Sequence, residues 1–290
     1  MKHKVYILGD TGLLGLSFIK YFKNKKFQLV TNSSMLKKRP NFEDIKTVFE
    51  ILNKVKPNFI LNFSGATNVD ECEENKNFAK KNYTIPSNLR EWQKTSLDTK
   101  IIHISTDQVY GGKGPHYEKK ATPLNIYGLT KKRGEEFFSK KNTCILRTNF
   151  FGYSINENSF SDWIYNSIKK NKKIKLFRNI KFNPLSISKL CSIIKTLIIK
   201  KFQPGIYNLG SKNGFSKSKF AILFIKNICP EYKNYEVVDF EQTFAAKRNC
   251  DMRMNVTKFQ KKFKINLPTL TKEIFYEIKK YKKINLKIKN

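Results

Sequence analysis

The segment Lys4-Val5-Tyr6-Ile7-Leu8-Gly9-Asp10-Thr11-Gly12-Leu13-Leu14-Gly15 decides the fold of this chain. Its first five residues are mainly apolar and predict a buried β-strand that ends at Gly9. Residues 13–22 predict a helix that begins inside the glycine turn. Gly9, Gly12 and Gly15 allow a tight turn and a close approach of the helix to the strand. The free N–H groups at such a helix start bind phosphate, although the same spacing also suits a plain strand-to-helix turn.

Apolar strands and helices continue to alternate through the first half of the chain. Further strands are predicted at residues 28–31, 59–63, 100–105 and 143–147, and further helices at 44–54, 78–93 and 127–140. This alternation is typical of an α/β fold with a doubly wound parallel sheet of the Rossmann type. It becomes irregular after about residue 150, so we expect a smaller C-terminal lobe there, interleaved with the first domain.

The composition and charge of the chain exclude several classes of protein. The 290 residues include no apolar run of about 18, so no transmembrane segment is expected. Five scattered cysteines without a Cys-x-x-Cys pair indicate neither a disulfide framework nor a zinc site, and a reducing cytoplasm is the simplest setting. The net charge of +34 favours anionic partners, but the lysines are spread along the whole chain and no nucleic-acid-binding motif accompanies them. We therefore expect no nucleic-acid partner.

The end of the second predicted strand bears on the choice of cofactor. An acidic residue there binds the ribose 2′-hydroxyl of NAD, whereas a basic residue accepts the 2′-phosphate of NADP. Residues 31–39 contain no acid, and Ser33, Ser34, Lys37, Lys38 and Arg39 can surround a phosphate. The segment predicts a preference for NADPH, with NADH as the second choice, although basic residues in a basic chain carry little weight. Residues 1–150 are accordingly the predicted NAD(P)-binding domain, and residues 151–290 mainly the substrate-binding lobe.

Tyr127 and Lys131 are four residues apart on a predicted helix, so they share one face and can reach the same nicotinamide ribose. A carbonyl that is reduced by hydride needs a proton on its oxygen, which Tyr127 can donate. The ammonium of Lys131 is expected to lower the pKa of the tyrosine. Thr106, at the carboxyl end of a strand, can hold the substrate oxygen. These residues predict a reductase.

Six segments, the glycine turn among them, extend the pattern over nearly the whole chain. They are Gly9–Gly15 (GDTGLLG), Asn62–Asp70 (NFSGATNVD), Ser105–Tyr110 (STDQVY), Pro123–Lys131 (PLNIYGLTK), Leu146–Gly152 (LRTNFFG) and Lys247–Met252 (KRNCDM). With these motifs the chain resembles the extended short-chain dehydrogenase/reductases, and within them the dTDP-4-dehydrorhamnose reductase group.

The resemblance implies roles for single residues. The cofactor-binding set that it implies is Gly9, Thr11, Gly12, Leu13, Gly15, Asp44, Ile45, Ser64, Gly65, Ala66, Tyr127 and Lys131. Within this set, the glycine turn would hold the pyrophosphate and Asp44 and Ile45 would lie by the adenine. Substrate would bind between Thr106, Asp107, Phe150 and the second lobe.

Two positions depart from the family pattern, and both are on the substrate side. Phe150 stands where a tryptophan is usual, and Arg248-Asn249 stands where Arg-Pro is usual. Arg248 is nevertheless a candidate for the pyrophosphate of the substrate, because guanidinium groups bind phosphate oxygens in pairs. Asn183, in Phe182-Asn183-Pro184, is expected to line the pocket or to form a simple turn.

The leading hypothesis is NADPH-dependent reduction of the 4-keto group of a nucleotide-linked 6-deoxy sugar, for surface polysaccharide synthesis. A nucleotide-sugar epimerase or dehydratase of the same superfamily is one alternative, and a non-catalytic regulatory subunit with this fold is another. The acidic run Asp70-Glu71 and Glu73-Glu74 suits a helix start better than a metal site, so no metal is expected. A homodimer is left open. Residues 279–289 are interpreted as a solvated C-terminal segment in preference to a contact with a membrane surface.

Overall fold

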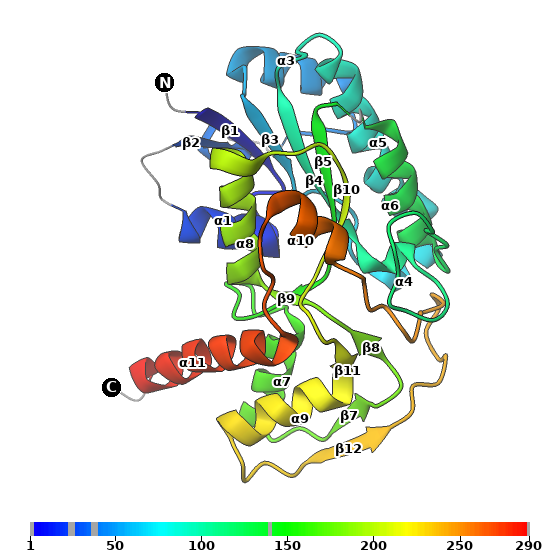
Figure 1. Ribbon diagram of the computed structural model, residues 1–290, viewed down its shortest axis with the longest axis vertical. Coiled ribbons are helices and arrows are strands. Elements are labelled where there is room, and N and C mark those ends of the chain that lie inside the picture. The colour runs from blue at the N-terminus through cyan, green and yellow to red at the C-terminus, as the bar shows by residue number, and fades with distance from the viewer. Residues whose placement is uncertain (1–2, 23–26, 36–39, 139–140, 289–290) are drawn as a thin grey trace.

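The computed structural model describes residues 3–22, 27–35, 40–138 and 141–288 (Figure 1). Its centre is a six-stranded sheet in the order β10-β5-β4-β3-β1-β2, and every neighbouring pair is parallel. These strands are β1 (His3–Leu8), β2 (Phe27–Thr31), β3 (Phe59–Asn62), β4 (Lys100–Thr106), β5 (Thr143–Thr148) and β10 (Gly205–Leu209). Because β1 has β2 on one side and β3 on the other, the strand order reverses there, and a crevice opens beyond the carboxyl ends of these strands.

Helices cover both faces of the sheet, as β1 illustrates. Val5 and Ile7 belong to one apolar core, whereas Tyr6 and Leu8 belong to the core on the opposite face. The first core is covered by α1 (Leu13–Tyr21), α8 (Ile187–Thr196) and α10 (Thr257–Phe263), and the second by α3 (Ile45–Val55), α5 (Lys76–Gln93) and α6 (Ile126–Phe137). The predicted doubly wound α/β sheet is confirmed.

Three short helical segments connect elements around the sheet. They are α2 (Asn32–Met35), α4 (Val69–Glu74) and a 3₁₀ turn at Asp107–Val109. A π-helical turn at Leu197–Lys201 leads from α8 towards β10. The acidic run that begins at Asp70 is the helix α4, and the side chain of Asn68 caps its start by accepting a hydrogen bond from the N–H of Glu71.

A second lobe has an apolar core of its own. Its helices are α7 (Phe160–Lys169), α9 (Lys217–Ile228) and α11 (Leu270–Ile288). Its short strands pair as β6 (Phe150–Phe151) with β9 (Leu185–Ser186), β7 (Ile174–Phe177) with β12 (Tyr235–Val238), and β8 (Lys181–Phe182) with β11 (Phe215–Ser216). Within the described residues, no helix has both the length and the hydropathy to cross a bilayer.

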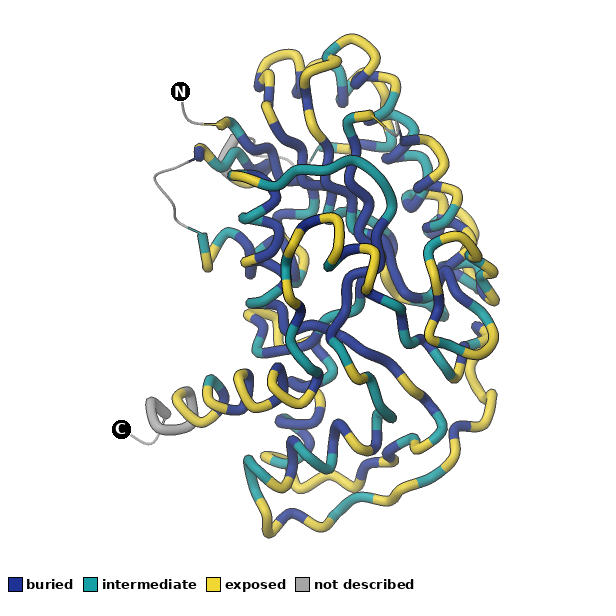
Figure 2. Tube along the Cα trace, in the orientation of Figure 1, coloured by how far each residue is buried: buried dark blue, intermediate teal, exposed yellow. Residues whose placement is uncertain are grey.

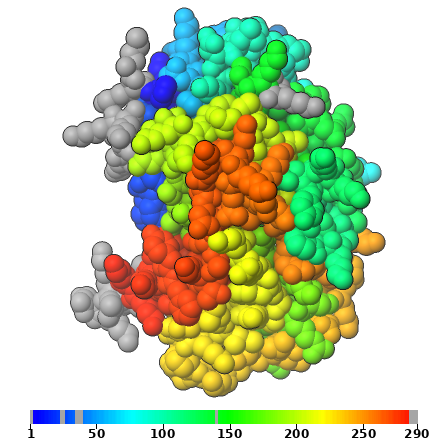
Figure 3. Space-filling view, in the orientation of Figure 1, coloured from blue at the N-terminus to red at the C-terminus, as the bar shows by residue number. Residues whose placement is uncertain are grey.

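Residues 279–288, which belong to the segment expected to be solvated, continue α11; Lys279, Lys282 and Lys283 are exposed, whereas Tyr281 is buried. Ile274, Ile278 and Tyr281 lie along one side of this helix and are buried in the core of the second lobe. Figure 2 shows this side as buried and the opposite side as exposed, and Figure 3 shows α11 beside α10 on one face of the molecule. The side chains of residues 284–288 lie outside the description.

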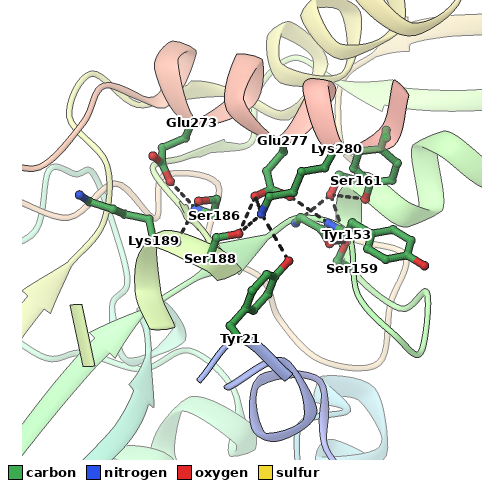
Figure 4. A network of polar contacts seen from close by, with 12 residues as sticks. Tyr21, Tyr153, Ser159, Ser161, Ser186, Ser188, Lys189, Glu273, Glu277 and Lys280 are labelled. Atoms are coloured by element: carbon green, nitrogen blue, oxygen red, sulfur yellow. Dashed lines mark hydrogen bonds and ion pairs between the residues drawn. The ribbon is translucent and has the colours of Figure 1, made fainter. Parts of the chain in front are cut away.

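A polar network attaches α11 to the other half of the molecule (Figure 4). The buried carboxylate of Glu277 accepts hydrogen bonds from the Ser188 hydroxyl (2.9 Å) and the Tyr153 N–H (3.2 Å), and it pairs with Lys280 (2.8 Å). Ser188 belongs to α8, which covers the sheet, whereas Tyr153 opens a loop of the second lobe. The carboxylate of Glu277 therefore connects α11 both to α8, which covers the sheet, and to the loop that follows β6.

Candidate active site

The glycine turn leaves no room for side chains at two of its positions. Gly9 has a φ of +78°, and a Cβ there would lie 2.7 Å from the carbonyl carbon of Phe63. A Cβ on Gly15 would lie 2.1 Å from the carbonyl oxygen of Gly9. Gly12, the N-cap of α1, makes no side-chain cap, and the first turn of the helix carries no acid. Its N–H groups are therefore available to an anion, as a pyrophosphate requires.

A cleft of about 1010 Å³ lies beyond the carboxyl ends of the strands, large enough for a dinucleotide and part of a second ligand. It brings together most of the residues selected from the sequence. Those that line it are Gly9, Thr11, Gly12, Leu13, Gly15, Ser64, Gly65, Thr106, Asp107, Tyr127, Lys131 and Phe150. Residues from the Rossmann half form one wall, and Asn156, Asn158, Ser159 and Phe160 of the second lobe contribute to the other.

Tyr127 and Lys131 occupy the first two turns of α6. The helix begins at the N-cap Asn125, whose side chain accepts a hydrogen bond from the N–H of Gly128 (2.8 Å). The Nζ of Lys131 donates a hydrogen bond to the carbonyl oxygen of Ile104 on β4 (2.7 Å). Thr106 is the last residue of that strand, so the helix and the strand end hold all three candidate catalytic residues in the cleft.

The pKa values of this pair differ from the expectation. Burial raises the pKa of Tyr127 to about 12, against the opposing effect of a hydrogen bond with Thr106. Burial also lowers the pKa of Lys131 to about 8, and the nearby Glu135 opposes this shift. In this structure the effect of burial outweighs any lowering of the tyrosine pKa by Lys131. Tyr127 is therefore a neutral phenol that can donate its O–H.

Asp107 is a buried carboxylate beside Thr106. Burial raises its pKa to about 6, although a hydrogen bond from the Nδ2 of Asn149 (2.7 Å) and one from Thr106 (3.3 Å) act in the opposite direction. Asn149 also lines the cleft, and the sequence analysis did not select it. The sequence feature that could have indicated Asn149 as a cleft residue is its position directly before Phe150.

The adenine end of the predicted site is arranged differently from the expectation. The carboxylate of Asp44 is the N-cap of α3 and accepts hydrogen bonds from the backbone N–H groups of Lys46 and Thr47. Neither Asp44 nor Ile45 lines the cleft; residues 40–43 do so instead. Ala66 is buried just behind the lining and donates its N–H to the side chain of Asn82 (2.9 Å).

Ser33 lies in α2, two residues after the end of β2, and is not part of the cleft lining. Its N–H and its hydroxyl both bind the carboxylate of Asp10, each at 2.9 Å. Lys37, Lys38 and Arg39, which were expected to accept a 2′-phosphate, lie outside the described residues, as does the side chain of Ser34.

Two predicted substrate residues lie outside the cleft lining. Asn183 is buried, donates to the carbonyl oxygens of Ser211 and Met254, and accepts a hydrogen bond from the N–H of Met254, so its polar atoms bind the backbone of the second lobe. The guanidinium of Arg248 forms an ion pair with Asp70 of α4 across the two lobes. Phe150, by contrast, lines the cleft directly.

Comparisons with known proteins agree with this geometry. A family model described as RmlD substrate binding domain matches residues 3–283. The spore coat polysaccharide biosynthesis protein SpsK of Bacillus subtilis is 26% identical over 225 residues, which cover 75% of this chain and 77% of that protein. The dTDP-4-dehydrorhamnose reductase of Shigella flexneri is 27% identical over 245 residues, which cover 79% and 81% of the two chains.

A solved structure gives the same fold. The dTDP-4-dehydrorhamnose reductase of Bacillus anthracis, determined in complex with NADP, superposes with a TM-score of 0.86 at 22% identity and covers 97% of this chain and 100% of its own. The resemblance expected from the sequence motifs is thus confirmed. The chain belongs to the RmlD substrate binding domain family.

Proposed function

We propose that this protein is an NADPH-dependent reductase of the 4-keto group of a nucleotide-linked 6-deoxy sugar, similar to the dTDP-4-dehydrorhamnose reductases. The observation that carries the proposal is the meeting of Thr106, Tyr127 and Lys131 in one cleft with an uncapped glycine turn. The turn fits a dinucleotide pyrophosphate, and the three side chains fit a carbonyl undergoing reduction. NADH is the second candidate cofactor.

The residues of the cleft account for the reaction. When bound, the dinucleotide supplies the hydride that adds to the keto carbon. Thr106 and Tyr127 donate hydrogen bonds to the keto oxygen, whose negative charge grows as the carbonyl bond opens. Tyr127 then gives its phenolic proton to this oxygen, so the product is an alcohol and the phenolate regains a proton from solvent. The Lys131 ammonium favours the transient phenolate and can reach the ribose from the same helix face.

The alternatives are weaker for specific reasons. Dehydratases of this superfamily usually place Asp-Glu after the catalytic threonine, whereas Asp107-Gln108 follows Thr106 here. A regulatory subunit has no need of Tyr127 and Lys131 held together in a cleft. A role in surface polysaccharide synthesis draws support from the similarity to SpsK. Five free cysteines fit a reducing cytoplasm.

The test is NADPH oxidation by the purified protein across a panel of nucleotide-linked 4-keto sugars, with Tyr127→Phe as the control. We expect turnover with one member of the panel and a loss of about 10²–10⁴-fold in the variant, whose fold and cofactor binding stay intact. Full activity in Tyr127→Phe would overturn the assigned proton donor. Silence of the wild-type protein across the panel, with cofactor bound, would favour the epimerase or the regulatory subunit.

A further inference from the structure

The exposed side of α11 carries lysine and aromatic side chains, and no acid among its described residues. Its members, which we call the α11 stripe, are Lys272, Phe275, Tyr276, Lys279, Lys282 and Lys283. Because an α-helix turns by about 100° and rises by about 1.5 Å per residue, these six lie within an arc of roughly 120° and span roughly 16 Å along the axis. The stripe is opposite the face of α11 that is buried in the second lobe (Figure 2).

The two acids of α11 are buried, away from the stripe. Glu273 accepts a hydrogen bond from the N–H of Ser186 (2.8 Å), and Glu277 belongs to the buried network of Figure 4. Among the described residues, no carboxylate lies within ion-pair distance of the four lysines of the stripe. Their positive charge is therefore not neutralised by a neighbouring acid, and it faces the solvent on one side of the helix.

Two aromatic rings lie among these lysines. Phe275 is 40% exposed and Tyr276 is 52% exposed, and neither belongs to the apolar core of the second lobe. The ring centre of Tyr276 is 4.8 Å from the Nζ of Lys280, whereas no described ring or cation covers Phe275. Aromatic rings that are exposed on a basic helix face suit the boundary between water and lipid headgroups, where aromatic side chains are enriched.

Helix α10 extends the positive surface on the same face of the molecule (Figure 3). The exposed lysines in and directly after this helix are Lys258, Lys261, Lys262 and Lys264. Between residues 257 and 283 every exposed charged side chain is a lysine, and this segment contains no arginine. Nucleic-acid sites favour the planar fork of arginine, whereas lysine clusters with aromatic residues on a helix are typical of binding to anionic lipid.

We infer that the α11 stripe binds the surface of an anionic lipid bilayer. The lysines of the stripe lie against the phosphates of the headgroups, Phe275 and Tyr276 enter the headgroup region, and the lysines of α10 add to the attraction. Such binding is peripheral and reversible, because it depends on charge and on two partly exposed rings. The inference is independent of the proposed reductase, since no residue of the stripe lines the catalytic cleft.

The first test measures co-sedimentation of the protein with vesicles of phosphatidylcholine, with and without phosphatidylglycerol. The stripe variant is Lys272→Gln, Lys279→Gln and Lys282→Gln combined. Its matched control is Lys113→Gln, Lys119→Gln and Lys120→Gln combined, which removes three exposed lysines from a loop elsewhere on the molecule. We expect wild type to bind only the vesicles that contain phosphatidylglycerol, the stripe variant to bind at least about 10-fold more weakly, and the control to stay within about threefold of wild type.

A second test reports on the aromatic contact without changing the charge. Phe275→Trp places a fluorophore in the stripe, and Tyr117→Trp is its control, because Tyr117 is 61% exposed in the same loop as Lys113 and Lys119. With anionic vesicles whose acyl chains carry bromine, we expect Phe275→Trp to be quenched beyond the wild type and Tyr117→Trp to match it. Equal quenching in the two variants would overturn insertion of the stripe into the headgroup region.

The remaining outcomes separate a membrane surface from other partners. Equal weakening by the two triple variants would show a general effect of the net charge and would overturn the inference, as would the absence of binding to anionic vesicles. Single-stranded RNA is the competitor: if it displaced the protein from vesicles and lost affinity for the stripe variant alone, with Phe275→Ser unchanged on both ligands, the face would be a nucleic-acid site. Thermal unfolding of all variants is expected to match wild type, since the substituted side chains are exposed.

Discussion

The carboxylate of Asp10 accepts two hydrogen bonds from Ser33, one from its N–H and one from its hydroxyl, each at 2.9 Å. Asp10 follows the first glycine of the turn, whereas Ser33 follows β2, so this pair joins the phosphate end of the cofactor site to its predicted ribose end. A fixed carboxylate beside Ser33 repels the dianionic 2′-phosphate of NADPH more than the hydroxyl of NADH.

Removal of this charge should therefore increase the preference for NADPH. In Asp10→Asn, the side-chain oxygen can still accept from Ser33, but the repulsion is gone. We expect the ratio of kcat/KM for NADPH to that for NADH to rise about 3- to 10-fold, the effect of roughly 1 kcal/mol. A ratio that stays constant or shifts towards NADH would show that the 2′-position lies away from Asp10.

Two alanine substitutions in the glycine turn should have different effects. A Cβ on Gly12 would meet only the carbonyl oxygen of Gly9, at 3.4 Å, so Gly12→Ala should fold but bind the dinucleotide at least about 10-fold more weakly, because the methyl group faces the pyrophosphate. Gly15→Ala forces a Cβ to within 2.1 Å of that oxygen and should destabilise the protein itself. Thermal unfolding together with dinucleotide titration distinguishes the two, and normal cofactor affinity in Gly12→Ala would contradict the assigned phosphate site.

The buried Asp107 makes stability depend on pH. Its pKa is about 6 in the folded protein and near 3.8 in the unfolded chain, so the native state holds the proton more tightly. Stability is greatest below pH 4 with respect to this group and falls as the pH rises through 6, by up to about 3 kcal/mol. Asp107→Asn removes this cost and should be more stable than wild type at pH 7.5.

Chemical denaturation of wild type and Asp107→Asn at pH 7.5 and at pH 4.5 checks this prediction. The stability advantage of the variant should shrink at the lower pH, because wild-type Asp107 is then largely protonated. If Asp107→Asn were more stable than wild type by the same amount at pH 7.5 and at pH 4.5, the pKa of Asp107 in the folded protein would be that of an ordinary carboxyl group. The variant should also lose activity, since Asp107 lines the cleft beside Thr106.

The carboxylate of Glu277 should contribute more to stability than an exposed acid. Glu277→Ala removes the only carboxylate that the Lys280 ammonium contacts in the described residues, and we expect a loss of about 3 kcal/mol in the free energy of unfolding. Glu236→Gln is the control, because Glu236 and Lys173 form an exposed pair at 3.8 Å, which is worth roughly 0–1 kcal/mol. Equal losses in the two variants would contradict a structural role for the network in Figure 4.

Glu277 should also influence the cleft from a distance. It holds the N–H of Tyr153, and the loop that follows contributes Asn156 and Asn158 to the cleft wall. The milder variant Glu277→Gln should therefore raise KM for the sugar substrate a few-fold and leave kcat nearly unchanged. A fall in kcat at constant KM would point to an effect on Tyr127 instead.

The sequence allowed the Rossmann half to be predicted well because its signals are local. Buried parallel strands are short apolar runs, and the glycine turn and the Tyr-x-x-x-Lys pair lie within single elements. The place of Asp44 beside the adenine stays a prediction; the structure shows this residue as the N-cap of α3, a common role for an acid at the start of a helix. The division of the chain near residue 150 stays a prediction.

The second lobe was harder to predict because its contacts are long-range. The lysine-rich composition of α11 concealed Ile274, Ile278 and Tyr281, whose spacing of four and three residues marks a buried helix face.

The position of β10 limits how proteins of this kind can diversify. This strand comes from the later half of the chain but pairs with β5 at the edge of the central sheet, and α10 packs over the same face. A gene fragment that encodes the later half of the chain would therefore also encode β10 and α10, which belong to the Rossmann half of the structure. A single recombination junction near residue 150 would take β10 from one parent and the rest of the sheet from the other, so the two halves of this architecture are expected to diversify together.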